Sequence, residues 1–199
     1  MSTTAKPVTP DDFFLETSRL RMRPPTEGDV DGLWSHARNP AITEFLAWEP
    51  HADNSVTRSL IESLRKSQDA ASGYHWLILL DDTIIGLVSL IDVRHRHLTW
   101  TMNRAELAYW VAPDFQRRGF AAEAAKAVVD FGFSSLGLEK IRVAHATENV
   151  ASRIVSERLG FRKYATERRA YCKEGRWHDL IWYDLLRDEF LPWKDGKNK

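Results

Sequence analysis

The sequence has little cysteine, no net charge and no long apolar run. Cys172 is the only cysteine among 199 residues, which excludes an internal disulfide and a metal site built from several thiolates. Twenty-eight Lys and Arg residues balance 28 Asp and Glu residues, so no overall field favours nucleic acid or an anionic membrane. No apolar run approaches membrane-spanning length, and residues 1–10 contain no apolar signal core. These absences predict a cytoplasmic protein without nucleic-acid or membrane partners, whose anion sites are local.

Linkers, internal repeats and low-complexity segments are also missing, so we expect one domain. We divide the chain into a flexible N-terminus (1–12), a folded domain (13–191) and a C-terminal tail (192–199). Apolar periodicity and turn residues predict the elements. They are strand 17–24, helices 26–39 and 55–71, strands 74–80, 84–93 and 104–112, helix 121–136, strand 141–146, helix 149–159 and strands 161–169 and 176–186. This order is typical of an α/β or α+β domain with one mixed sheet and helices packed on it.

The most informative stretch is Gln116-Arg117-Arg118-Gly119-Phe120-Ala121, which joins strand 104–112 to helix 121–136. A basic strand-to-helix turn presents backbone N–H groups, the positive end of a helix dipole and two guanidinium groups at one point. That combination suits a diphosphate. The sequence contains neither Gly-Lys-Ser/Thr nor Gly-x-Gly-x-x-Gly, which counts against a P-loop nucleotidase and a dinucleotide-binding fold. The turn therefore predicts a local site for an anionic cofactor.

A second strand–helix unit supplies the specificity, because it carries Asn149, Ser152 and then Leu159-Gly160-Phe161. With both segments in view, the chain resembles the GNAT superfamily of acetyl-CoA-dependent N-acetyltransferases over roughly residues 17–190. The family's Gln/Arg-x-x-Gly-x-Gly/Ala motif is matched by residues 116, 119 and 121, and its later Asn-x-x-Ser/Ala segment by residues 149 and 152. Segment 107–113 is similar to the strand before this turn in the RimJ/RimL branch. The resemblance implies the GNAT fold: a single mixed, mostly antiparallel twisted sheet flanked by helices, with a splayed parallel strand pair forming the CoA cleft.

The resemblance also implies how acetyl-CoA, the cosubstrate, is held. Backbone N–H groups of the turn would cradle its diphosphate, with Gly119 allowing close approach. The N–H near Val111 would polarise the thioester carbonyl, and Asn149 would hold the pantetheine arm or its neighbouring loop. The implied cofactor-binding residues are Val111, Gln116, Arg117, Arg118, Gly119, Phe120, Ala121 and Asn149. No metal is implied, and the segment 95–97 with its two histidines is expected to be a solvated hairpin tip.

Acetyl transfer requires the attacking amine as its free base. The reference pKa is about 7.7–8.0 for an α-amino group and about 10.4 for lysine, so a modest base suffices for an α-amine. Glu106 is our candidate base, and a structural ion pair with Arg104 is the alternative. Many GNAT enzymes use a tyrosine seven residues after the Asn as the general acid, and this chain has Ser156 at that position. Ser152, Ser156 and a bound water are therefore the open candidates for protonating the thiolate.

The predicted acceptor site lies on two segments. Trp48 and His51 stand between the two early helices, where RimJ/RimL-like proteins shape the acceptor site. A capped turn with a packed indole is the alternative there. Trp177 lies in segment 171–179, which bridges the last two strands and would line the other wall. Tyr109 completes the predicted substrate-binding set.

The resulting prediction is an N-acetyltransferase that moves acetyl from acetyl-CoA to a primary amine by direct attack. The favoured acceptor is a protein N-terminal α-amine, as in the RimJ/RimL type, with a ribosomal protein as one example. A small amine, such as an antibiotic or an aminoacyl-nucleotide toxin, is an alternative that would give resistance. A non-catalytic CoA-binding regulatory module is a third. Whether the protein forms a homodimer stays open.

Overall fold

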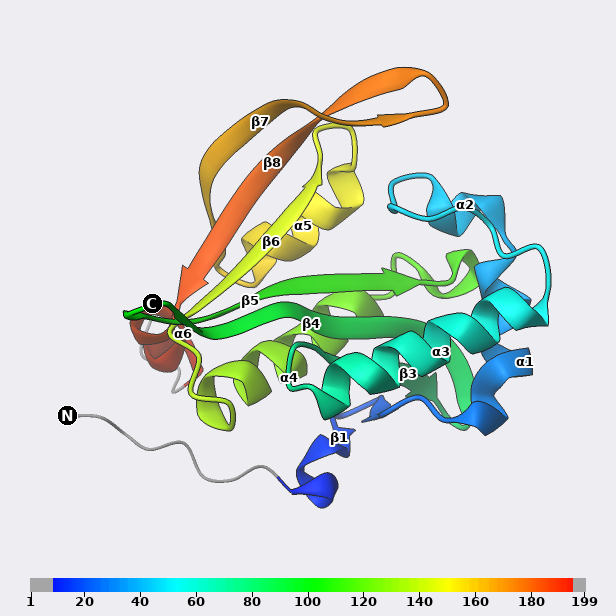
Figure 1. Ribbon diagram of the computed structural model, residues 1–199, viewed down its shortest axis with the longest axis horizontal. Coiled ribbons are helices and arrows are strands. Elements are labelled where there is room, and N and C mark those ends of the chain that lie inside the picture. The colour runs from blue at the N-terminus through cyan, green and yellow to red at the C-terminus, as the bar shows by residue number, and fades with distance from the viewer. Residues whose placement is uncertain (1–8, 195–199) are drawn as a thin grey trace.

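The described strands form one open sheet in the order β1-β2-β3-β4-β5-β6-β8-β7 (Figure 1). The computed structural model describes residues 9–194. The strands are β1 Leu15–Glu16, β2 Arg21–Arg23, β3 Tyr74–Leu80, β4 Thr83–His97, β5 Trp100–Val111, β6 Lys140–Ala146, β7 Arg162–Lys173 and β8 Arg176–Leu186. The helices are α1 Val30–Ala37, α2 Pro40–Thr43, α3 Asn54–Asp69, α4 Phe120–Ser134, α5 Val150–Arg158 and α6 Arg187–Lys194. Short 3-10 helices are η1 Pro10–Phe13, η2 Glu27–Asp29 and η3 Pro113–Phe115.

Neighbouring strands run antiparallel except for β5 and β6, which are parallel. Parallel neighbours require a crossover connection, and α4 provides it. This arrangement confirms the predicted mixed, mostly antiparallel sheet with one parallel strand pair.

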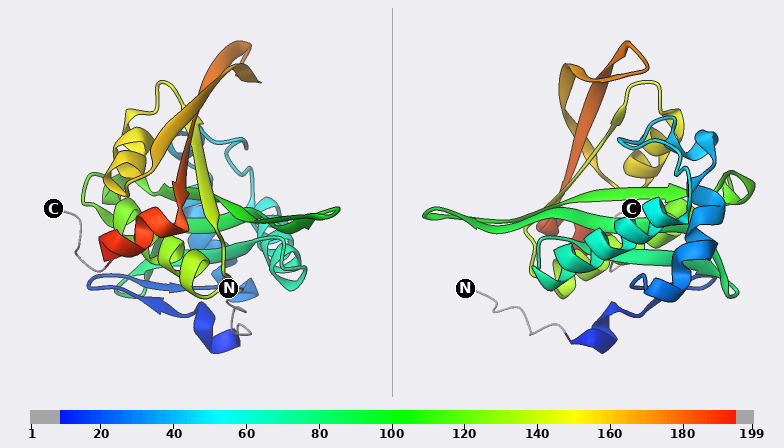
Figure 2. Two further views of the ribbon diagram at one scale, coloured as in Figure 1. Left: turned by 90° about the vertical axis from the view of Figure 1, so that its left-hand side faces the viewer. Right: turned by 45° about the vertical axis from the view of Figure 1, so that its right-hand side comes forward.

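Helices cover both faces of the sheet, and each face has its own apolar core (Figure 2). In β3, Tyr74, Trp76 and Ile78 belong to the larger core, whereas Leu77 and Leu79 belong to the smaller one. Successive side chains of a strand point to opposite faces, so β3 is mostly apolar because both of its faces are covered, and His75 is its one buried polar side chain. We call the side of the larger core, under α4 and α5, the α4 face. The side of the smaller core, under α1 and α3, is the α3 face.

Most predicted elements are confirmed, with different ends. The predicted first strand, 17–24, is shorter because residues 17–20 form a turn in which the Thr17 N–H donates to the Leu20 carbonyl. Strands β4 and β5 extend further toward their shared tip than predicted, and His95 to His97 are exposed there, as expected. The sequence did not predict α2 or α6, and α6 extends into the stretch assigned to the C-terminal tail. Residues 1–8 and 195–199, at the predicted flexible ends, lie outside the described residues.

One glycine in the sheet is required by a close approach of two strands. Gly86 in β4 pairs with Val111 in β5, and a Cβ on Gly86 would collide with the backbone carbonyl of Trp110. The absence of a side chain therefore lets β5 lie close to β4 at its C-terminal end. No helix within residues 9–194 is long and apolar enough to cross a membrane.

Candidate functional site

The turn between β5 and α4 has unpaired backbone donors. Gly119 caps α4 in a left-handed conformation with φ +82°, which favours glycine. Within the described residues, the backbone N–H groups of 117–121 make no hydrogen bond of standard geometry to protein acceptors. The first N–H groups of a helix lack partners within the helix, and here no side chain caps them. The turn can therefore offer several donors, together with the helix dipole, to one anion.

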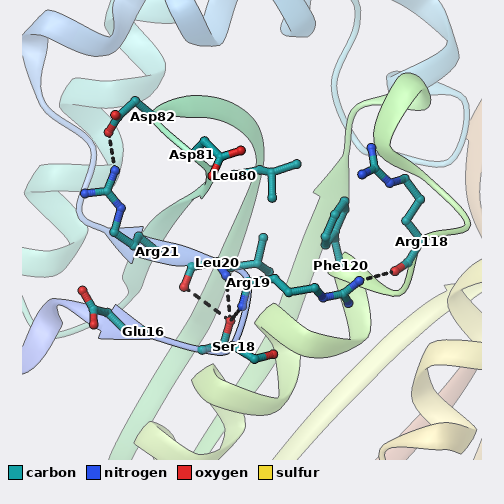
Figure 3. A pocket seen from close by; sticks show the side chains of 11 residues that line it. Glu16, Ser18, Arg19, Leu20, Arg21, Leu80, Asp81, Asp82, Arg118 and Phe120 are labelled. Carbon is teal, nitrogen blue, oxygen red and sulfur yellow. Dashed lines mark hydrogen bonds and ion pairs between the residues drawn. The ribbon is translucent and has the colours of Figure 1, made fainter.

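A basic residue that the sequence analysis missed supports this turn. Arg19 comes from the turn between β1 and β2, and its Nη1 donates to the Arg118 carbonyl at 3.0 Å (Figure 3). Arg19 and Arg118 both stack on the Phe120 ring, at 4.6 and 4.8 Å from its centroid. Glu123 pairs with Arg19 at 2.5 Å, and the hydrogen bonds that this carboxylate receives lower its pKa although partial burial opposes them. A cavity of about 670 Å³ beside the turn includes Arg19, Arg21 and Arg118 in its lining.

Beyond the turn, β5 and β6 part from each other. Their pairing covers only three residue pairs and ends at Glu106 opposite Arg142, after which the strands diverge (Figure 1). The Ala112 N–H donates to the Ile85 carbonyl of β4 at 2.8 Å. Because N–H directions alternate along a strand, those of Val111 and Tyr109 point away from β4, toward the diverging β6. We call this region, in which the two strands are not paired, the gap.

The side chain of Gln116 is engaged inside the protein. Its Nε2 donates to the Val111 carbonyl at 2.9 Å, which fixes the turn to the end of β5. Gln116 therefore holds the shape of the turn through this hydrogen bond. Asn149 has a comparable position in the second unit, because its Oδ1 accepts the Ser152 N–H at 3.0 Å and caps α5.

Glu106 lies on the α3 face, at the point where the gap closes. Its Oε2 is 3.4 Å from Nη2 of Arg142, which also approaches Asp92 at 3.3 Å. The ion-pair partner is therefore Arg142 on the neighbouring strand and not Arg104, as the alternative supposed. Burial raises the pKa of Glu106 above its ordinary value, Arg142 opposes this, and Asp92 reinforces it.

Tyr109 was predicted to contact the acceptor, but it points to the α4 face. Its hydroxyl lies 2.9 Å from Ser152 Oγ at the start of α5. Ser156, which is 1% exposed, donates to the Ser152 carbonyl at 3.0 Å. The next residue of β5, Trp110, occupies the opposite face and packs against the smaller core. Strand alternation therefore assigns Trp110, and not Tyr109, to the side of Glu106.

The two predicted acceptor segments lie across from each other. Lys173 of β7 is 13% exposed, and its Nζ donates to the carbonyls of Thr43, Leu46 and Trp48 at 2.5, 3.1 and 3.4 Å. One lysine thus ties the loop after α2 to the β7–β8 hairpin. A second cavity of about 670 Å³ lies between them. Its charged lining residues are Glu44, Glu49, Glu148, Glu174, Lys173 and Arg176.

The predicted acceptor residues Trp48, His51 and Trp177 occupy different environments and are not among the residues that line this cavity. Trp48 is half-buried and packs against His51 and Trp110, with ring centroids 4.9 and 6.5 Å apart. His51 is 7% exposed, its Nδ1 bonds the Thr57 hydroxyl at 2.8 Å, and burial lowers its pKa. His51 therefore supports Trp48 from behind. Trp177 is 58% exposed on β8, away from these aromatic contacts.

A gap beside a turn with free N–H donors suits a ligand that joins an extended arm to a diphosphate. Comparison with known proteins agrees: the acetyltransferase (GNAT) domain model matches residues 19–162. The chain therefore belongs to the GNAT family and is an acetyltransferase, which favours an enzyme over a non-catalytic module.

Relatives share the fold but differ in the acceptors that their names give. YoaA of Bacillus subtilis, an uncharacterized N-acetyltransferase, is 29% identical over 87% of this chain and 97% of its own length. The RimL ribosomal L7/L12 α-N-protein acetyltransferase in complex with coenzyme A superposes with a TM-score of 0.80 at 19% identity, covering 88% of this chain and 98% of that one. The Vibrio cholerae spermidine N-acetyltransferase in complex with CoA and spermine gives 0.76 at 24% identity, covering 88% and 99%.

Proposed function

We propose that this acetyltransferase moves the acetyl group of acetyl-CoA to the N-terminal α-amine of a protein, by direct attack of the amine on the thioester. The observation that carries the proposal is the position of Glu106, a partly buried carboxylate at the closed end of the gap. A base there lies beside the only stretch of β5 where a thioester could lie between the strands. The loop after α2 and the β7–β8 hairpin would select the acceptor, which we propose is a cytoplasmic protein such as a ribosomal protein.

The free N–H groups of 117–121 would bind the coenzyme A diphosphate, with Arg117 and Arg118 adding charge. Its pantetheine arm would pair with the unpaired edge of β5, where the N–H groups of Val111 and Tyr109 face the gap. These donors would polarise the thioester carbonyl and stabilise the oxyanion as the amine attacks.

An α-amine suits this base better than a lysine or a polyamine. With a reference pKa of about 7.7–8.0, an α-amine is partly deprotonated at neutral pH, whereas an amine near 10.4 must lose a much more tightly held proton. The pKa of Glu106 is raised, but a carboxylate is still only a modest base. Acting directly or through one water, it can accept the proton that an α-amine loses during attack.

A polyamine is the second candidate, because the cavity between the loop after α2 and the β7–β8 hairpin is acidic. Four glutamates face one lysine and one arginine there, a formal balance of −2 (−4 and +2). A field of this sign attracts cations, and a neighbour of the same fold is named as a spermidine N-acetyltransferase bound to spermine. The same charge would equally attract a basic side chain near the N-terminus of a peptide.

An acceptor panel with acetyl-CoA separates these candidates. It contains a peptide with a free N-terminus and an internal lysine, the same peptide with a formylated N-terminus, and spermidine. We expect thiol release and a mass shift with the free peptide only, because the formylated peptide retains just its lysine amine. Faster turnover of spermidine than of the peptide would overturn the α-amine assignment. Thermal stabilisation by acetyl-CoA without turnover of any amine would support a regulatory module instead.

A further inference from the structure

The acid that the sequence left unassigned has a structural counterpart on a different element. Residue 156 is a serine, yet a tyrosine hydroxyl reaches the same part of α5 from β5. The Tyr109 hydroxyl lies 2.9 Å from Ser152 Oγ and 3.4 Å from the Ser152 carbonyl, and Ser156 bonds that same carbonyl. A tyrosine hydroxyl from β5 therefore lies beside the first turns of α5.

The backbone confines where the reacting thioester can lie. The turn at residues 116–121, where the diphosphate would bind, follows the C-terminal end of β5. The gap ends at Glu106 and Arg142, where β5 and β6 are paired. An extended arm that enters from the turn passes Val111 first and Tyr109 next, and it can go no further than the closed end. Its sulfur is therefore confined to the stretch of β5 that carries Tyr109.

The two faces of this stretch carry different chemistry. Glu106 lies on the α3 face, the side of Trp110 and Trp48, from which the amine would approach. Tyr109 lies on the α4 face, beside α5. A base on one side of the thioester and a hydroxyl donor on the other suit acyl transfer, in which the attacking amine loses a proton and negative charge develops on the departing sulfur.

We propose that the Tyr109 hydroxyl donates a hydrogen bond to the coenzyme A sulfur and stabilises the thiolate as the C–S bond breaks. This inference rests on acetyl transfer and on the cofactor placement proposed above. The amine nitrogen forms its bond to the acetyl carbon, and the C–S electron pair moves to sulfur. The amine proton goes to Glu106, directly or through water. Tyr109 keeps its own proton, and the thiolate takes one from solvent on release.

The environment of Tyr109 fits a hydrogen-bond donor better than a proton donor. Burial raises the pKa of Tyr109 to about 12, and hydrogen bonds from Ser152 and Ser156 oppose this. An alkyl thiol has a reference pKa of about 8.5, so the proton stays on the phenol and the charge stays on sulfur. Ser152 and Ser156, our earlier candidates for the acid, are bound to each other and to Tyr109, which makes them positioning residues.

Tyr109→Phe tests the proposal, with Tyr164→Phe as the matched control because Tyr164 is exposed on β7. We expect Tyr109→Phe to lower kcat by about 10- to 100-fold, the range of one hydrogen bond to a charged group. The thiolate absorbance of bound CoA, titrated against pH, should show a pKa about one to two units higher than in the wild type. Binding of desulfo-CoA, which lacks the sulfur, should be unchanged, and the control should match the wild type throughout.

Two results would overturn the proposal. An unchanged pKa of the bound thiol would mean that Tyr109 does not touch the sulfur. Equal weakening of CoA and desulfo-CoA, together with a lower melting temperature, would mean that the hydroxyl only anchors α5. A failure of the cofactor placement looks different, because wild-type protein would then bind neither CoA nor desulfo-CoA.

Discussion

Replacement of Gly119 by valine tests the cofactor site most directly, because the chain contains a matched control. Gly119 and Gly160 share φ +82°, a conformation that residues with a Cβ rarely adopt. A Cβ on Gly119 would contact only the flexible end of Arg19, at 3.4 Å, and a Cβ on Gly160 would meet nothing within 4 Å. The two substitutions therefore impose the same backbone strain with little steric overlap inside the protein.

The strain gives similar losses of stability in the two variants. A left-handed conformation costs an L-residue about 1–2 kcal/mol, which corresponds to a fall in Tm of roughly 2–8 °C for a chain of this size. Only Gly119→Val should also weaken acetyl-CoA, because the turn either relaxes and rotates its N–H groups away or places a branched side chain in the phosphate space. Loss of two hydrogen bonds to a charged group, at about 1.5–3 kcal/mol each, raises Kd by about 10²- to 10⁴-fold.

Thermal unfolding and titration calorimetry with CoA measure both quantities on the same samples. We expect equal shifts of Tm and a large increase in Kd for Gly119→Val alone. The assignment of the turn would be refuted if Gly119→Val bound CoA with wild-type affinity, or if Gly160→Val lost affinity to the same extent.

Three further predictions concern the base, the loop and a buried histidine. Glu106→Gln should lower kcat by about 10²- to 10⁴-fold without changing CoA affinity, and an unaltered rate from about pH 6 to 9 would remove Glu106 as the base. Lys173→Met should raise the acceptor KM and speed proteolysis within residues 43–48, whereas Lys163→Met should do neither. Burial lowers the pKa of His75 to about 4, so the folded state resists protonation. Stability should therefore fall by about 3 kcal/mol as pH drops from above 6.5 to 4, and urea unfolding of His75→Gln should lose most of this dependence.

Local patterns in the sequence were sufficient for the fold and for the position of the turn at Gly119. The turn at Gly119 is recognisable because its requirements are local: a strand before it, a helix after it, and a glycine where the backbone takes a positive φ, as it also does at Arg117. The parallel pair follows from the same pattern, since β5 and β6 are separated by a helix.

The residues whose surroundings differ from our expectation depend on register and on which face of the sheet is covered. Arg104 was the natural partner for Glu106 in sequence, but the pairing of β5 with β6 places Arg142 opposite it. Tyr109 and Trp110 are both aromatic, and only the position of α4 decides which of them faces α5. His51 was expected at the acceptor site, yet it is buried against Thr57.

Contacts between distant parts of the chain were not predictable either. Arg19 reaches Arg118 across 99 positions, and Lys173 reaches Trp48 across 125. No periodic pattern relates residues at such separations, because their proximity follows only from the order of strands in the finished sheet. A basic residue between two short strands would be the one available signal for Arg19.

The missing side chain at Gly86 has a consequence for the gap, which lies on the other side of β5. Any residue with a Cβ at this position would push the end of β5 away from β4, and β6 is the neighbour of β5 on its other side. The width of the gap, where we propose that the pantetheine arm lies, thus depends on a residue on the opposite side of β5. In a library of variants designed to change the acceptor, Gly86 should therefore be kept.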